Sequence, residues 1–278
     1  MYQLKKIRVW NRTRLAKRRE IKAQRHLEKM EGKLALIAIM KNESHILPEW
    51  IEHYADQGVD KIILIDNGST DDSVEVAKAH ARNGLVEVVF RLEKWKQDQH
   101  YQDTVKDKRL INRFEWLMVA DLDEFWFVKD GTPLVRKLDD YQGVDVVYCN
   151  WTLFGSSGHI EQPKSVRQSF TKAIPWLSEP LITKWLVRTA ALSSPKQLVT
   201  HRINDVTSYT THTDNVDLQL NHYFLQSQQY FETTKMKRGN VQTDQHQDKA
   251  TLDYFKSHDA LCTKLDTLII DKVLKARQ

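Results

Sequence analysis

Residues 34–71 read LALIAIMKNESHILPEWIEHYADQGVDKIILIDNGSTD, and this stretch decides the fold. The apolar runs 34–40 and 61–65 are typical of buried strands, and residues 44–57 between them repeat apolar side chains at helical spacing. A helix that joins two neighbouring strands favours a right-handed crossover and a parallel sheet. The sequence therefore predicts an α/β fold with a mostly parallel sheet flanked by helices.

The same alternation continues to residue 120, and the pattern becomes less regular after residue 146. We expect further strands over 85–90, 116–120, 146–150 and 218–224. We expect helices over 72–82, 95–113, 227–238 and 260–275, and a polar surface loop over 242–250.

A basic segment precedes the first strand. Residues 1–33 hold twelve Lys and Arg against three Glu, so the rest of the chain is mildly acidic although the net charge is +5. The segment is predicted to be a helical arm, either a solvated helix or one that binds an anionic membrane surface. It carries no aromatic stacking platform, so no specific nucleic acid is expected as a partner.

The apolar run 34–40 is far shorter than the ~20 residues of a membrane-spanning helix, and nothing before it resembles a signal segment. We expect a cytoplasmic location, with peripheral attachment to the inner face of the membrane as one option. Cys149 and Cys262 lie far apart without metal-ligand spacing, which fits a reducing compartment.

Polar clusters follow three of the predicted strands, at 41–43, 66–71 and 121–124. The carboxyl ends of parallel strands share one edge of a sheet, where ligands bind. Asp121 and Asp123, two apart on chain expected to be extended, would project to the same side and could hold Mg²⁺ or Mn²⁺. The alternative is that both are solvated turn residues.

Structural alternatives exist for the other two clusters. Asn-Gly and Ser-Thr-Asp over 67–71 are turn and helix-capping chemistry, although Asp66 at the strand end could also accept hydrogen bonds from a base or ribose. Asn42 and Glu43 could equally cap the following helix.

Five motifs, in order, resemble glycosyltransferase family 2 and family 92-like proteins. They are Lys41-Asn42-Glu43, Asp66 to Asp71, Trp116 to Phe125 ending in Asp-Leu-Asp-Glu-Phe, Trp151 to His159, and His222-Tyr223-Phe224 followed by Lys235 and Arg238-Gly239. The resemblance implies a GT-A fold and sugar transfer from a nucleotide-sugar donor, with inversion as the usual outcome. It divides the domain 34–278 into a nucleotide-binding half, 34–125, and an acceptor half, 126–278.

The resemblance also implies roles for single residues. The nucleotide sugar, with uridine diphosphate as the expected nucleotide and galactose as a guess for the sugar, would contact Asn42, Glu43, Asp66, Asn67, Asp121, Lys235 and Arg238. Asp121 and Asp123 would be the Asp-x-Asp that holds Mn²⁺ or Mg²⁺, with His222 as a candidate third ligand. His222 could instead be a structural histidine, and the two basic residues could simply lie near a helix C-terminus.

The acceptor, a glycan or a lipid-linked sugar of polysaccharide synthesis, is expected near Trp151, Ser156 and His159. A carboxylate must deprotonate its hydroxyl, and Glu161 is favoured because it follows this loop. No spacing separates it from the other candidates, which are Glu124, Glu179, Asp205 and Asp214.

Two other function classes account for part of the sequence. A haloacid dehalogenase-like phosphotransferase also places Asp-x-Asp after a parallel strand, but on its first strand and with Thr or Val where Phe125 stands here. A non-catalytic membrane- or nucleic-acid-binding module would explain the arm and leave the acidic residues at the strand ends unexplained.

Overall fold

The computed structural model describes residues 30–81, 84–94, 96–175, 182–205, 209–238 and 251–275. Nearly all of the predicted basic arm lies outside these residues, as do the predicted loop 242–250 and Glu179. Gly32 and Lys33, the last residues assigned to the arm, already belong to the first strand.

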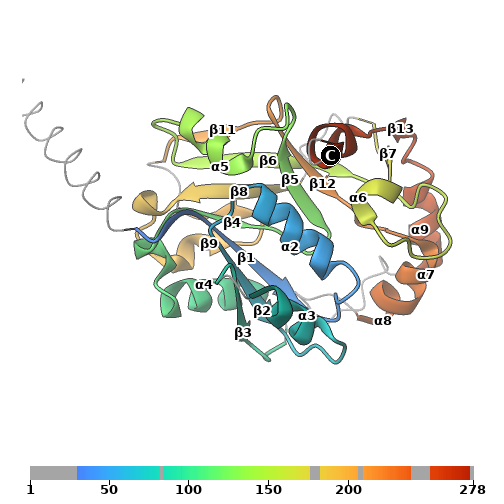
Figure 1. Cartoon of the computed structure of the whole chain (residues 1–278), viewed down its shortest axis with the longest axis horizontal. Helices are drawn as coiled ribbons and strands as arrows, with labels where there is room; N and C mark the ends of the chain where they lie inside the picture. Colours follow the sequence, from blue (N-terminus) through green and yellow to red (C-terminus); the bar gives the residue numbers. More distant parts are fainter. Residues whose placement is uncertain are drawn as a thin grey trace, which may run out of the picture.

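A mixed sheet forms the centre of the described part of the chain (Figure 1). Its strand order is β3-β2-β1-β4-β8-β6-β12-β5, and β11 pairs with β6 beside this path. Strands β1 to β4 are parallel, whereas β8 runs antiparallel to both β4 and β6, and β5 runs antiparallel to β12. The strands are β1 Gly32–Met40, β2 Lys61–Asp66, β3 Val86–Phe90, β4 Phe114–Val119, β5 Glu124–Val128, β6 Val146–Leu153, β8 Thr183–Arg188, β11 Thr211–Thr213 and β12 Leu218–His222.

Helices cover both faces of the sheet because β1 is apolar on both sides. Leu34, Leu36 and Ala38 pack in one core with the apolar faces of α2 (Leu47–Asp56) and α3 (Ser73–His80). Ala35 and Ile37 point the other way, into a second core with α4 (Gln97–Asp107). The expected α/β fold is confirmed, and it is the layered architecture that a GT-A fold requires.

The second half of the chain uses short elements. The helical ones are α5 Leu134–Lys137, α6 Val166–Ser169, α7 Gln228–Tyr230, the π-helical η6 Phe231–Lys235, α8 Met236–Arg238, α9 Leu252–Asp259 and the π-helical η8 Ile270–Leu274. Two-residue strands form the pairs β9 (Leu198–Val199) with β10 (Arg202–Ile203), and β7 (Lys172–Ala173) with β13 (Lys264–Leu265). The 3₁₀ turns are η2 Leu110–Asn112, η3 Leu138–Asp140, η4 Thr189–Ala191 and η5 Pro195–Gln197.

The predicted elements of the first half are found with shifted ends, and the helical run over 227–238 is found as α7, η6 and α8 in succession. The predicted helix over 260–275 is found only in its last part, as η8, because Lys264–Leu265 is extended and pairs with β7. The sequence pattern does not predict β5, β8 or the short strands β7, β9, β10, β11 and β13. Within the described residues, no helix combines the length and apolar character needed to cross a membrane.

Candidate active site

The acidic turn, Asp121 to Glu124, joins β4 to β5 at the carboxyl edge of the parallel strands. The expectation that Asp121 and Asp123 lie on extended chain is wrong. The Glu124 N–H donates to the Asp121 carbonyl at 3.0 Å, and the Glu124 side chain accepts from the Asp121 N–H at 2.9 Å, so the chain closes on itself. Leu122 anchors the turn because its side chain is buried in the core.

Helix α2 holds the acidic turn from behind. The indole N–H of Trp50 donates to the carbonyls of Asp121 and Glu124 at 3.0 and 3.1 Å. The Tyr54 hydroxyl donates to the Glu124 carbonyl at 3.1 Å. These bonds give the Glu124 carbonyl two partners and the Asp121 carbonyl a second one, so helix α2 fixes the turn in place.

Lys184 of β8 neutralises one side of the turn. Its side chain is 0% exposed, and its Nζ lies 2.9 Å from Asp121 Oδ2 and 3.6 Å from Glu124 Oε1. Burial opposes charge on Asp121, but the Lys184 ammonium outweighs it and lowers the pKa of Asp121. Glu124 is fully buried, and desolvation raises the pKa of its carboxyl well above the ordinary value. The sequence reasoning missed Lys184.

Asp123 is paired on the other side of the turn. Lys235, the last residue of η6, places Nζ 2.8 Å from Asp123 Oδ2, and His222 at the end of β12 places Nε2 3.4 Å from Oδ1. Burial alone would raise the pKa of Asp123, yet Lys235 and His222 together hold this pKa well below the ordinary value. Asp123 is therefore a carboxylate.

Trp151 forms the aromatic wall beside this pair. Its ring centroid lies 4.2 Å from that of His222 and 5.3 Å from that of His201. The indole N–H of Trp151 and Nδ1 of His222 are buried, and neither has a hydrogen-bond partner among the described residues. The structure thus brings Asp121, Asp123, Trp151 and His222 together from three separate segments.

The expected metal ligands are close together but are not assembled as a metal site. No group of three or more His, Cys, Asp or Glu side chains within the described ranges is arranged to hold a metal ion. The chemistry of the donor set fits Mn²⁺ or Mg²⁺, since it offers two carboxylates and an imidazole. Lys184 and Lys235 instead bond oxygens that a cation would use.

The residues expected to contact a nucleotide also make internal hydrogen bonds. Asp66 accepts from the N–H groups of Gly68 and Ser69 at 3.1 to 3.3 Å, as the turn alternative predicts. Asn42, at a φ of +57°, accepts from the Thr70 N–H at 2.7 Å and so ties two strand-end loops together.

Asn67 and Glu43 are buried. The Asn67 amide donates to the main-chain carbonyls of Arg91 and Glu93, which links the ends of β2 and β3. Glu43 accepts from the Tyr230 hydroxyl at 3.1 Å, so it joins the first half of the chain to α7. Arg238 ends α8, but its side chain is outside the described residues.

In the loop expected to form the acceptor site, Ser156 and His159 both make contacts within the protein. Ser156 is buried, and its N–H and hydroxyl both donate to the Asp259 carboxylate of α9, at 2.6 and 2.8 Å. Ser156 thus fastens the loop to α9, and its expected acceptor role stays a prediction. The His159 ring packs edge-on against Phe170, with centroids 5.6 Å apart.

Glu161 is exposed on a segment that docks beside α7. The neighbouring Gln162 donates to Gln226 at 2.7 Å, and the Gln229 N–H donates to the Ile160 carbonyl at 2.9 Å. Among the other base candidates, Glu124 is fully buried, Asp214 accepts from Tyr141 at 2.5 Å, and Asp205 is exposed in a loop after β10.

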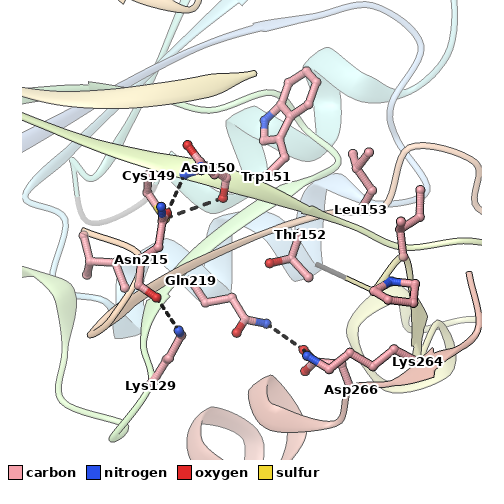
Figure 2. A pocket seen from close by; sticks show the side chains of 13 residues that line it. Lys129, Cys149, Asn150, Trp151, Thr152, Leu153, Asn215, Gln219, Lys264 and Asp266 are labelled. Carbon is pink, nitrogen blue, oxygen red and sulfur yellow. Dashed lines mark hydrogen bonds and ion pairs between the residues drawn. The ribbon is translucent and has the colours of Figure 1, made fainter. Parts of the chain in front are cut away.

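Two cavities lie near these groups. A polar cleft of about 650 Å³ separates the loop after β1 from α7, η6 and α8 and is lined by Lys41, Asn42, Ser44, His45, Asp71, Gln162, Gln229, Tyr230, Thr233, Thr234 and Lys237. A smaller cavity of about 110 Å³ borders β6 and β12 (Figure 2). There Gln219 points to Asp266 and Lys129 to Asn215, so these polar groups bond each other.

Residues 37–260 match the model of Glycosyltransferase family 92. Similar curated proteins include glycosyltransferase family 92 proteins of Oryza sativa subsp. japonica and Ricinus communis. Each is 25% identical, over 65% and 74% of this chain and over 31% and 38% of the respective relative. The chain thus spans about a third of the length of these relatives.

Similar solved structures include S. aureus TarS 1-349 in complex with UDP-GlcNAc, at 11% identity and a TM-score of 0.48, covering 87% of this chain and 74% of that one. Another is GalNAc-T7 with UDP, GalNAc and Mn²⁺, at 11% identity and a TM-score of 0.46, covering 88% and 57%. Both likenesses are distant.

Proposed function

Since the chain belongs to glycosyltransferase family 92, we propose that it transfers a sugar from a nucleotide-sugar donor, with uridine diphosphate as the nucleotide, to a hydroxyl of a glycan or lipid-linked acceptor. The observation that carries the proposal is the acidic turn at the carboxyl edge of the sheet, where Asp121 and Asp123 lie among Lys184, His222 and Lys235. Such a group of charges suits a diphosphate that leaves with negative charge.

On the donor side, the negative charge of the leaving diphosphate must be stabilised. Asp121, Asp123 and His222 would hold Mn²⁺ or Mg²⁺, which would stabilise the diphosphate as the bond to the anomeric carbon breaks. Trp50 and Tyr54 keep the turn rigid, so little reorganisation is needed during the reaction. Lys235 and Arg238 would bind phosphate oxygens. Asn42, Glu43, Asp66 and Asn67 shape the strand-end loops where the base and ribose would lie.

The acceptor side needs a base and a binding surface. In the proposed reaction, the Glu161 carboxylate takes the proton of the acceptor hydroxyl, whose oxygen bonds the anomeric carbon as the donor bond breaks, with inversion. Glu161 is exposed, and its neighbour Gln162 lines the polar cleft between the two halves. Trp151 and His159 would contact the acceptor sugar.

A membrane role for residues 1–29 belongs to the same proposal, because it would keep the enzyme near a lipid-linked acceptor. Sedimentation with anionic vesicles, compared between the full chain and a chain that lacks these residues, tests the role. Equal sedimentation of the two would contradict it.

Calorimetric titration of uridine diphosphate, with and without Mn²⁺, tests the donor half. We expect metal-dependent binding by the wild type, loss of that binding in Asp121→Asn with Asp123→Asn, and unchanged binding in the matched variant Asp140→Asn, whose carboxylate is exposed and pairs with Lys137. Absence of binding by the folded wild type under both conditions would refute the proposed donor and favour a non-catalytic binding module.

A further inference from the structure

The charges at the acidic turn are already balanced without a metal. Asp121 pairs with Lys184, and Asp123 pairs with Lys235. A divalent cation added to this arrangement would face two ammonium groups at close range, and one carboxylate oxygen of each aspartate is already taken. Metal binding is therefore favoured if one of the ammonium groups gives up its carboxylate, because this removes repulsion and frees a second carboxylate oxygen.

The two lysines differ in their freedom to move. Lys184 is 0% exposed on a strand between β4 and β6, and it faces the Asp121 carboxylate and the carboxyl group of Glu124. Its ammonium would have to leave a fully buried position and its 2.9 Å ion pair with Asp121, which is costly. Lys184 must therefore stay.

Lys235 is in the opposite situation. Its side chain is 17% exposed, and its partners are one carboxylate, Asp123, and the main-chain carbonyl of Phe224. It is the last residue of the π-helical segment η6, a geometry that is uncommon and often marks functional positions. An ammonium that leaves Asp123 can keep its bond to the Phe224 carbonyl and so remains near the acidic turn.

We propose that Lys235 is a displaceable countercharge: it occupies Asp123 in the metal-free enzyme and moves to the donor's diphosphate when a divalent cation takes Asp123. The proposal rests on the proposed nucleotide-sugar donor. Metal and nucleotide diphosphate should accordingly bind better together than apart.

The test measures Mn²⁺ and uridine diphosphate binding to the purified full chain by calorimetry, for Lys235→Met and the wild type. Without nucleotide, Lys235→Met should bind Mn²⁺ about fivefold more tightly, because the cation no longer competes with an ammonium. With saturating Mn²⁺, the same variant should bind uridine diphosphate at least about tenfold more weakly, because a charged hydrogen bond to phosphate is lost. Lys256→Met, a change to an exposed lysine of α9, should alter neither affinity.

The opposite signs of the two effects separate this role from a structural one. If Lys235 only stabilised the fold, Lys235→Met would weaken both affinities, and that result would overturn the proposal, as would an unchanged Mn²⁺ affinity. If the wild type bound neither Mn²⁺ nor uridine diphosphate, the proposed donor would fail instead. A second readout on the wild type is the ¹⁵Nζ resonance of Lys235, assigned by its loss in Lys235→Met, which should shift when diamagnetic Mg²⁺ is added and should not shift if the ammonium stays on Asp123.

Discussion

Replacement of Lys184 by methionine should destabilise the protein strongly. The Lys184 Nζ lies 2.9 Å from Asp121 Oδ2 and 3.6 Å from Glu124 Oε1. At an effective dielectric constant of about 20, the attraction between the ammonium and the Asp121 carboxylate is about 6 kcal/mol before the cost of removing the charges from water. Because methionine leaves the partly exposed Asp121 carboxylate and the buried Glu124 carboxyl without the ammonium, we expect the free energy of unfolding to fall by about 3 kcal/mol.

Urea titration followed by tryptophan fluorescence measures this loss, with Glu124→Gln and the double variant completing a cycle. Glutamine removes the fully buried carboxyl, so the double variant should be more stable than the sum of the two single changes predicts, by at least about 1 kcal/mol. Lys256→Met should stay within about 0.5 kcal/mol of the wild type. A loss below about 1 kcal/mol in Lys184→Met, or strict additivity in the cycle, would refute the assignment of Lys184 as the buried countercharge.

Two further predictions concern pH and backbone geometry. Burial, followed by the nearby Lys184 ammonium, lowers the pKa of His201 from 6.5 to about 4, so neutral His201 contributes stability above pH 6.5 that is lost as the pH falls through about 4. Urea titrations over this range should show a smaller loss for His201→Gln, and parallel profiles would contradict the prediction. Gly131 has a φ of +92°, and an added Cβ would meet the Lys272 carbonyl at 2.7 Å, whereas Gly84 has a φ of +73° with nothing within 4 Å. Gly84→Ala should therefore cost about 1 kcal/mol and Gly131→Ala clearly more, and equal costs would show that the contact relaxes freely.

The sequence was most informative where local pattern and tertiary structure agree. The runs 34–40 and 61–65 are uniformly apolar because β1 and β2 are covered on both faces, and the helix between them has a clear apolar stripe. Asp121, Asp123 and His222 were placed correctly beside one another, although nothing in their spacing revealed the turn geometry. That geometry depends on Trp50 and Tyr54, about seventy residues earlier in the chain.

The sequence pattern does not predict strand β8 or helix α9, and the physical reason differs between the two. Strand β8 reads TKWLVR, and a lysine inside a short apolar run argues against a buried strand unless its countercharges are known. Those countercharges, Asp121 and Glu124, lie on a different segment. Helix α9 was not predicted because it directly follows a long polar run, where no periodic pattern leads in and only the cap residue Thr251 marks its start.

The order in which the chain is made gives the acidic turn one more consequence. Lys184 is 63 residues after Asp121, and Lys235 is 112 residues after Asp123. At about 5 to 20 residues per second, a ribosome adds Lys184 about 3 to 13 seconds after Asp121. During that interval the nascent first half has the strands that form the turn but neither of its cations. Folding of the first half therefore depends on synthesis of the second half. A chain that stops before residue 184 should stay incompletely folded and exposed to quality-control proteases.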